Sequence, residues 1–426
     1  MSTMPWRILV ISDLGVDSGE PAPVTAETLP RWFDSLGLPV TLAQLDPAER
    51  IASGVSGTAL DTFLHDPKQQ RLEATALGLA RVLAEAAGAV TVEVLSLPRK
   101  ALVEGFRARV HERELTAAAP VTLVVLDFDF SHKAEDLAAL KALAAMAAEL
   151  QAPIVANAGA GFFELRFLVQ AGAVKDIAGR LQSPAHNGWQ AFQKEEDARW
   201  LCLTLNRFLL RAPHERADYR ETCSESNPDS YLWGRGVWLV AAAVARSVKT
   251  NGHALDLSGS GGHFGGVATR PFPVTANESR ALAAEVPFPD AQALELTHAA
   301  FTPVTGALGQ SNLMLPMVVT THRYAPGKLT VEGTLAYQIT AARVALACGT
   351  VAGALDGGAD DAAIGERVRG LLSEQLGGLL GDQPEALAVQ VLPADEQAPR
   401  RVAVTVKPPL VLETKSPVFG MEFAIG

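Results

Sequence analysis

The sequence predicts a mixed α/β fold in which helices flank β-sheets and extended strands lie at both ends of the chain. Three observations predict it. The apolar run Arg7–Ser12 has the composition of a central strand that is covered on both faces. Strand and helix patterns then alternate between residues 60 and 156. The segment from Arg401 onward alternates apolar and polar residues with the period of two that is typical of a strand.

The first fifty residues contain the strand Arg7–Ser12, a short helix around Trp32 and Phe33, and a second possible strand, Leu38–Leu42. A block of this size is too small to bury a core alone. We therefore expect it to pack on the segments that follow.

Helical spacing of apolar residues runs from Leu60 to Leu83 but crosses Asp66 and Pro67, which predicts two helices rather than one. The elements expected next are the strand Val90–Leu97, the helix Ala101–Arg113, the strand Val121–Leu126, a helix over 137–150 and the strand Pro153–Ala156. This order predicts a sheet with helices on its faces.

Leu201, Leu205 and Phe208 recur at helical spacing and predict one long helix from Trp189 to Pro213. Further helices are expected at Tyr231–Lys249, Leu335–Leu355 and Ile364–Leu376. The region from 252 to 310 is rich in glycine and proline, so we expect no long regular element there.

The strand signals of the C-terminal segment come in three pieces, namely Val402, Val404 and Val406, then Leu410 and Leu412, then Met421, Phe423 and Ile425. Pro408 and Pro409 break the first piece, and no turn of the Asn-Gly type joins the three. We therefore expect strands without a partner nearby in the sequence, which could pair with the edge of another molecule.

The chain of 426 residues has 47 acidic and 36 basic side chains and a net charge of −11, which disfavours nonspecific binding to nucleic acid or to an anionic membrane. No run of about 18 apolar residues and no signal-peptide pattern is present, so we expect no direct membrane insertion and a cytoplasmic location. The three cysteines are widely spaced and are predicted to be buried thiols.

Four groups of residues are candidates for chemical or binding sites. The glycine-rich segment 258–266 lacks the lysine of a phosphate loop and predicts a flexible surface loop. His253, Asp256 and His263 provide too few ligands to predict a metal site. The tryptophans at 32, 189, 200, 233 and 238 are either core residues, which we favour, or interface residues. The arginines at 207, 211, 216 and 220 are either a solvated face or a surface for an acidic partner.

Asp127 and Asp129 follow an apolar strand, where an α/β enzyme could place catalytic or magnesium-binding carboxylates. We favour a second interpretation, in which these two residues and Ser131 bind backbone groups at a turn and cap the next helix. No other motif predicts catalysis, and no cofactor or metal is expected.

Five segments carry recognisable patterns, namely 59–83 with Leu64-His65-Asp66-Pro67, 124–156, 183–213, Leu232-Trp233-Gly234 and the tail from 401. These segments resemble the large sheath subunit of type VI secretion systems, the TssC or VipB family. The family-motif residues are Trp189, Asp197, Arg199, Arg207, Arg211 and Trp233. This chain departs from the family at Asn206, where proline is usual, and at Arg235, where asparagine is usual.

The first fifty residues resemble the small sheath subunit, TssB or VipA, so the chain is similar to a fusion of the two. The expected parts are a small-subunit-like segment (1–50), an α/β region (51–182), a helical and glycine-rich region (183–400) and a C-terminal strand arm (401–426). The family's long helical N-terminal extension, which the ClpV unfoldase grips, has no counterpart in this sequence. A ClpV-like unfoldase is therefore left open as a partner.

The resemblance implies a structural, non-enzymatic subunit that polymerises helically around an inner tube of Hcp type, engages a baseplate and contracts. It also implies that terminal strands pair between subunits. The residues concerned are Arg7, Ile8, Leu9, Val10, Val402, Val404, Val406, Leu410, Leu412 and Phe423. The alternatives are a non-polymerising baseplate, cap or adaptor component, and an α/β enzyme that uses Asp127 and Asp129.

Overall fold

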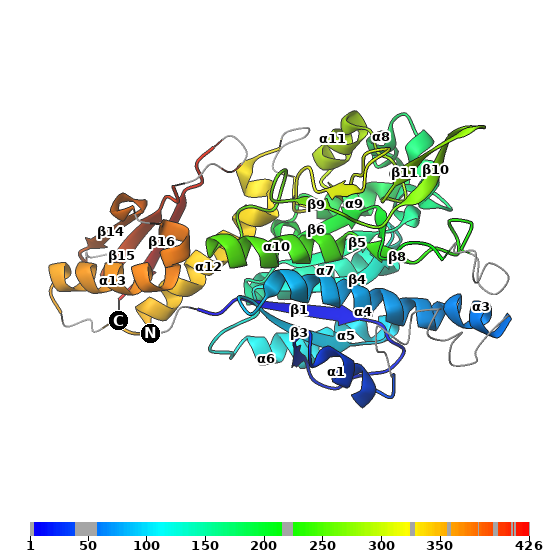
Figure 1. Cartoon of the computed structure of the whole chain (residues 1–426). Helices are drawn as coiled ribbons and strands as arrows, with labels where there is room; N and C mark the ends of the chain where they lie inside the picture. The colour runs from blue at the N-terminus through cyan, green and yellow to red at the C-terminus, as the bar shows by residue number, and fades with distance from the viewer. Residues whose placement is uncertain are drawn as a thin grey trace.

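The computed structural model describes residues 4–38, 58–214, 225–323, 329–355, 359–381, 383–394, 399–409, 412 and 415–425. Figure 1 shows a larger lobe built on a central sheet and a smaller lobe that contains the C-terminal strands. The helix α12 (Leu335–Ala352) runs between the two lobes.

A seven-stranded sheet forms the centre of the larger lobe, in the order β12-β6-β5-β4-β1-β3-β2. Its strands are β1 (Arg7–Ser12), β2 (Ala22–Val24), β3 (Thr91–Ser96), β4 (Leu123–Phe130), β5 (Ile154–Ala158), β6 (Leu201–Leu205) and β12 (Thr302–Pro303). All pairs are parallel except β2 with β3. Because β1 lies between β3 and β4, the predicted central strand is confirmed, and the N-terminal segment completes the sheet instead of forming a separate body.

Alternate residues of the strands enter two cores, one on each face of the sheet. Ile8 and Val10 belong to the core beneath α4 (Pro67–Ala86) and α10 (Val237–Asn251). Leu9 and Ile11 belong to the core beneath α5 (Leu102–Phe106) and α7 (Ala134–Leu150). The mixed α/β fold class is therefore confirmed.

The predicted break at Asp66 and Pro67 is also confirmed. The helix α3 (Thr58–Leu64) ends before it, and Pro67 is the first residue of α4. The Asp66 carboxylate accepts hydrogen bonds from the backbone N–H of Lys68 at 2.9 Å and of Gln69 at 3.0 Å. Asp66 thus caps the second helix.

The long helix predicted from Trp189 to Pro213 is wrong. The chain forms the short helix α9 (Asn187–Phe192), the 3₁₀ turn η7 (Glu196–Trp200), then β6 and β7 (Arg207–Leu209). Every residue of β6 is buried. A short apolar run that is buried on both faces has no period of two, so its spacing fits a helix as well as a strand.

The smaller lobe contains α13 (Asp361–Leu380) and an antiparallel sheet of β14 (Leu387–Leu392), β15 (Arg401–Val406) and β16 (Phe419–Ala424), with β15 in the middle. Val402, Val404 and Val406 are buried on one face, as their alternation predicts. The expectation that these strands lack a partner nearby in the sequence is wrong, since β15 pairs with β14 and β16, the strands that precede and follow it along the chain. The connecting segments are too long to show a tight-turn signal.

The residues predicted to pair between subunits therefore lie in different situations. Arg7–Val10 and Val402–Val406 have both strand edges paired inside this chain. Phe423 lies on β16, an edge strand, and Leu412 forms an isolated bridge with Lys415. Leu410 lies outside the described residues. Pairing between subunits stays a prediction, with the edge strands as its structural candidates.

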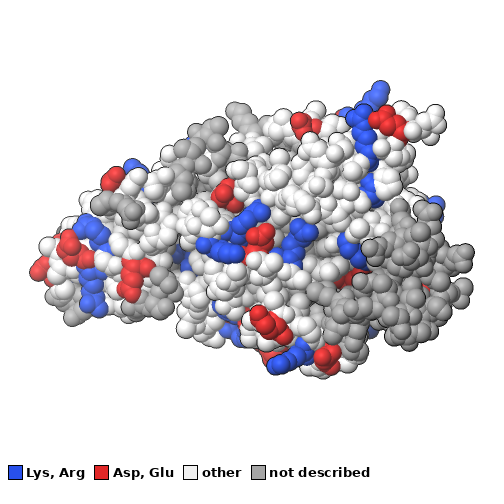
Figure 2. All heavy atoms as spheres, in the orientation of Figure 1, with Lys and Arg blue, Asp and Glu red and all other residues white. Residues whose placement is uncertain are grey.

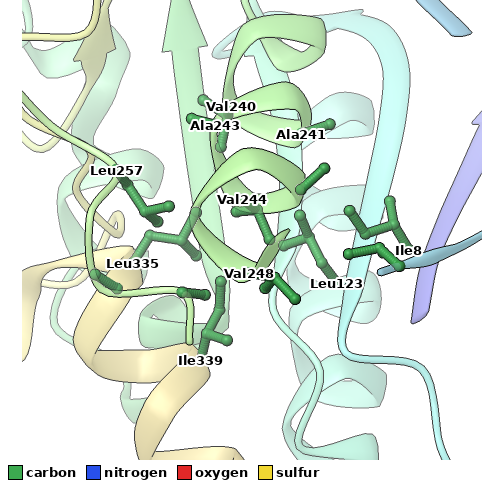
Figure 3. Close-up of a cluster of buried hydrophobic side chains, with 14 of the residues drawn as sticks. Ile8, Leu123, Val240, Ala241, Ala243, Val244, Val248, Leu257, Leu335 and Ile339 are labelled. Carbon is green, nitrogen blue, oxygen red and sulfur yellow. The ribbon is translucent and has the colours of Figure 1, made fainter. Parts of the chain in front are cut away.

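The two lobes share one core. Figure 3 shows Val240, Val244 and Val248 of α10 between Leu123 of β4 on one side and Leu335 and Ile339 of α12 on the other. The helix α12 has the length and hydropathy of a membrane span, but 61% of that window is buried inside the protein. It is the core helix that joins the lobes.

Only short elements occupy the described part of residues 252–310, as expected, and the longest is α11 (Asp290–His298). The remaining elements are α1 (Leu29–Ser35), η2 (Arg99–Ala101), the π-helical turn η3 (Arg107–His111), α6 (Glu112–Glu114), η4 (Ala160–Phe163), η5 (Leu168–Ala173), α8 (Ile177–Arg180), η6 (Pro184–His186), β8 (Trp233–Arg235), β9 (His263–Gly265), β10 (Arg270–Thr275), β11 (Glu278–Leu282), β13 (Asn312–Met314), η9 (Val331–Gly333) and η10 (Pro384–Ala386). The possible strand Leu38–Leu42 lies almost wholly outside the described residues.

Candidate functional site at the carboxyl edge of the sheet

The order of the parallel strands reverses between β1 and β4, and in α/β sheets the crevice at the carboxyl ends of such strands is the usual ligand site. This chain has a pocket of ≈ 370 Å³ there. Asp13, Asp127, Asp129 and Arg235 are among its lining residues. The crevice is therefore the first place to look for chemistry.

The guanidinium of Arg235 binds both aspartates of β4. Nη1 donates to Asp127 Oδ1 and Nη2 to Asp129 Oδ2, each at 2.9 Å. Asp127 also accepts from the hydroxyls of Ser12 and Thr75, both at 3.2 Å, and Asp129 accepts from Asn157 Nδ2 at 2.7 Å. The protein's own donors thus satisfy the carboxylates that a ligand would need.

The ion pair between Arg235 and Asp129 favours the charged form of both side chains. Burial disfavours the charged form of Asp129, but Arg235 outweighs it and, with the hydrogen bond from Asn157, lowers the pKa of that carboxyl. Burial likewise disfavours the charged form of Arg235, but Asp129 and Asp127 raise its pKa above the ordinary value. Because its pKa is lowered by this pairing, the Asp129 carboxylate is a weak base.

The favoured capping interpretation of Asp127 and Asp129 is wrong, because both bind Arg235. The residue before α7 is Lys133, which makes no side-chain cap. Ser131 does bind a backbone group at this turn, since its hydroxyl oxygen accepts from the N–H of Lys133 at 3.4 Å, and it donates from its own N–H and hydroxyl to Asp136 at 2.7 and 2.6 Å. The partner of the two aspartates is more than a hundred residues away in the chain, so no local pattern could predict it.

Two arginines of the family motif are paired in the same internal way. Arg207 binds Glu285 through two hydrogen bonds of 2.6 and 2.8 Å. Arg211 donates from Nε to Glu73 at 2.6 Å and binds both oxygens of Glu225 at 2.6 and 2.8 Å. Both arginines thus have an acidic partner within the chain, and the Arg207 side chain is still 39% exposed whereas that of Arg211 is 17% exposed. Residues 216 and 220 lie outside the described range.

Glu225 and Glu73 are almost completely buried, and both carboxylates bind Arg211. Burial would raise the pKa of Glu225, but the hydrogen bond and charge of Arg211 outweigh it and lower that pKa. The pairs with Glu225 and Glu73 raise the pKa of Arg211. Removal of this one arginine would take the bound guanidinium away from two buried carboxylates.

The aromatic motif residues are structural as well. Trp189 is fully buried, and its ring centroid lies 4.8 Å from that of Phe162 and 5.7 Å from that of Phe301. Trp233 donates from Nε1 to the carbonyl of Pro228 at 2.9 Å. The other tryptophans named above are buried too, which confirms the core interpretation for them.

Arg199 and Asp197 belong to the turn η7, where Arg199 forms an ion pair with Glu196. Glu196, Asp197 and Arg199 line a pocket of ≈ 430 Å³ together with Tyr337 and Met421 from the smaller lobe. Motif residues thus also reach the junction of the two lobes.

Asn206 has a backbone φ of 91°, a value that proline cannot adopt. Its Nδ2 donates to the carbonyls of Val286 and Val304, each at 2.8 Å, and its Oδ1 accepts from the N–H of Arg207 and Val286 at 3.0 and 3.1 Å. The buried amide thus stabilises the unusual backbone conformation. Both residues that depart from the family pattern, Asn206 and Arg235, therefore make hydrogen bonds within the protein.

The glycine-rich segment 258–266 packs against its neighbours. Gly261 and Gly262 are buried, and a Cβ atom at residue 262 would lie 2.7 Å from the carbonyl oxygen of Leu315. These glycines permit close packing, so the expectation of a flexible surface loop is not supported there. No group of three or more metal-ligating side chains occurs in the described part of the chain.

Charged side chains of both signs lie interspersed on the face in Figure 2, without a patch of one sign. The buried ion pairs of Arg207, Arg211 and Arg235 join elements of the protein to one another, so these arginines hold the framework in place.

The comparisons with known proteins identify the family. The VipB family model, described as EvpB/VC_A0108, tail sheath N-terminal domain, matches residues 50–322. This chain belongs to that family, which confirms the large-subunit resemblance. The family is structural, so the chain is a sheath-type structural subunit.

A curated relative, the type VI secretion system sheath protein TssC1 of Pseudomonas aeruginosa, is 25% identical over 163 residues. The match covers 36% of this chain and a third of the relative's length (33%). A chain of the anti-feeding prophage baseplate matches 97% of this chain and 91% of its own length, at 9% identity and a TM-score of 0.48. The sheath tail protein Lin1278 from Listeria innocua matches 71% and 56% at 9% identity and a TM-score of 0.35.

Proposed function

We propose that copies of this chain polymerise helically in the cytoplasm into a contractile sheath around an inner tube of Hcp type, and that contraction from a baseplate drives the tube. Family membership supports the sheath role. Polymerisation is supported by one observation, which is that the edge strands of the C-terminal sheet differ from those of the seven-stranded sheet.

The edge strands of the seven-stranded sheet are poorly suited to pairing with a further strand. One edge strand, β2, has three residues and contains Pro23, and the other, β12, has two residues and contains Pro303. Short edge strands and prolines prevent a further strand from pairing. The smaller sheet has edge strands of six residues each, β14 and β16, and neither contains proline.

Backbone groups of β16 are available to a neighbour. The N–H of Ile425 donates to the carbonyl of Arg400 on the β15 side at 2.9 Å. Because successive N–H groups alternate in direction, those of residues 420, 422 and 424 point away from β15. None of the described strands pairs with that outer edge of β16 or with the outer edge of β14.

Two different open edges favour a filament. If one neighbour adds a strand to β16 and another to β14, each contact joins unlike surfaces, and such contacts generate helical assemblies when the rotation does not close. The smaller lobe would then link subunits while the larger lobe moves as a rigid body. A difference of a few kcal/mol between two packings is enough for a bistable subunit.

The first fifty residues supply the centre of the large sheet, although the family match begins at residue 50. This arrangement supports the proposal that they correspond to the small sheath subunit. The fusion would place both sheath components in one chain, so that the protein assembles without a second sheath polypeptide.

The test is negative-stain electron microscopy of the purified full chain with two variants of one residue. Glu422→Pro removes an outward N–H of β16, and Glu422→Ala removes only the side chain that pairs with Arg401 at 3.2 Å. We expect long tubes from the wild type and from Glu422→Ala, and folded protein without tubes from Glu422→Pro. Tubes from Glu422→Pro would eliminate this edge as the link, whereas closed rings from the wild type would favour the baseplate, cap or adaptor alternative.

A further inference from the structure

A pocket of ≈ 340 Å³ lies at the junction of the two lobes, between the start of the chain, α12, α13 and the C-terminal end of α10. The backbones of Gly252 and Gly378 touch beside it, since a Cβ atom at residue 378 would lie 2.7 Å from the Gly252 carbonyl oxygen. Trp6, Leu376 and Leu379 provide apolar lining. No acidic side chain is among the described residues that line it.

Arg343 of α12 lines this pocket and is only 8% exposed. Its Nη1 donates to the carbonyl of Pro5 at 3.1 Å and its Nη2 to the carbonyl of Met4 at 2.6 Å. Its guanidinium carbon lies 3.8 Å from the ring centroid of Trp6. All three partners are uncharged, so the cation is held in place without being neutralised.

Arg343 differs in this respect from the three arginines described at the candidate site. Arg207, Arg211 and Arg235 each bind at least one carboxylate. Burial alone lowers the pKa of Arg343 to about 10, which leaves it charged at neutral pH. A buried cation without a counter-ion is costly, and a bound anion would remove that cost.

A second donor lines the same pocket. His253 accepts a hydrogen bond at Nδ1 from the N–H of Leu255 at 3.3 Å. Burial lowers the pKa of His253, although the charge of Asp256 opposes this shift. The lowered pKa favours the neutral ring. With Nδ1 as acceptor, the neutral ring carries its proton on Nε2, which is then a donor.

We propose that this pocket binds a carboxylate group joined to an apolar body. The guanidinium of Arg343 takes the carboxylate, and Trp6, Leu376 and Leu379 contact the apolar part. A single cation within a largely apolar pocket of this size fits such a ligand better than a multiply charged one. The carboxylate can come from a free organic acid or from an acidic side chain of a second copy, and the chain's excess of acidic residues offers many of the latter.

Titration calorimetry of the full chain tests the pocket with 3-phenylpropionate and with its uncharged amide. We expect the acid to bind at least about tenfold more tightly than the amide, because only the acid gains a charge-assisted hydrogen bond. Arg343→Met should weaken binding of the acid by a similar factor. The matched control is Arg369→Met, which removes an exposed arginine of α13 and should leave the affinity unchanged.

A second variant is needed because Arg343 also binds the carbonyls of Met4 and Pro5, so that Arg343→Met could weaken ligand binding by loosening the N-terminal segment. Ala89 is an exposed residue of the pocket lining, and Ala89→Trp would obstruct the pocket without touching the contacts of Arg343. This variant should lose the acid as well. Equal affinity for acid and amide, or full affinity in Ala89→Trp, would overturn the proposal.

Sedimentation velocity separates the two sources of the carboxylate. If an acidic side chain of a second copy occupies the pocket, Arg343→Met and added 3-phenylpropionate should each weaken self-association. If a free acid is the ligand, calorimetry detects binding and self-association stays unchanged. Absence of calorimetric binding together with unchanged self-association would refute both.

Discussion

The seven-stranded sheet of the larger lobe ends in strands of two and three residues, whereas both edge strands of the C-terminal sheet have six. The first sheet is covered on both faces and offers no long edge to another chain. The second is buried on one face only, and none of the described strands pairs with its outer edges. The C-terminal sheet can therefore link the subunit to neighbours without exposing the main core.

The two lobes also differ in where they place their charges. The larger lobe buries carboxylates against arginines, as in Glu73 and Glu225 around Arg211. The smaller lobe keeps its ion pairs near the surface, as in Arg369 with Glu366 and Arg401 with Glu422. Buried pairs are expensive to break, whereas surface pairs contribute little. We therefore expect the larger lobe to stay rigid through any rearrangement of the smaller one.

The largest effect should come from Arg211→Ala. It removes the guanidinium that binds the buried carboxylates of Glu73 and Glu225 and should lower the free energy of unfolding by about 3–5 kcal/mol. Urea denaturation at pH 7, followed by tryptophan fluorescence, measures this loss. The matched surface change, Arg369→Ala, should cost less than about 1 kcal/mol. Similar losses in both variants would break the comparison between the lobes.

The pH dependence of stability provides a further test of the Arg211 ion pair. Because the folded state lowers the pKa of Glu225, the Arg211 pair stabilises the protein above the ordinary pKa of 4.5. That contribution disappears as the pH falls through the lowered pKa of the folded state. The stability difference between wild type and Arg211→Ala should therefore shrink at acid pH. A difference that stayed constant below pH 4.5 would mean that the ion pair is not its source.

An intermediate effect is expected at Asn206, which holds the backbone at the end of β6. Asn206→Ala removes hydrogen bonds to buried backbone groups and puts a Cβ-bearing residue without a polar side chain at a φ of 91°. We expect a loss of about 2–3 kcal/mol in urea denaturation. Asn206→Gly relieves the backbone strain and should recover about 1 kcal/mol. If glycine were no better than alanine, strain at this residue would not contribute.

The sequence predicts those elements whose signal is local. The apolar run of β1, the break at Pro67 and the alternation of Val402, Val404 and Val406 each depend on neighbouring residues, and each is observed. The sequence of β6 also fits a helix, because burial on both faces of a strand removes the alternation of apolar and polar residues.

Partners that are distant in the chain could not be predicted. Asp127 and Arg235, for example, meet only because the fold brings β4 and β8 together. Arg343 gave no signal, since a single arginine in an apolar helical pattern has no local feature that indicates a pocket. The family resemblance supplied the sheath role, but the open edges and the junction pocket required the structure.

The smallest effect is expected at the closed edge of the large sheet. Pro23 is exposed on β2 opposite Glu93, and Pro23→Thr gives that edge a residue favoured in strands. We expect the free energy of unfolding to change by no more than about 0.5 kcal/mol, and tube formation to remain as in the wild type. The reason is that three residues are too few for a stable added strand even without the proline. If Pro23→Thr caused side-by-side aggregation of tubes in electron micrographs, the proline would be what closes this edge, and strand length would not be sufficient.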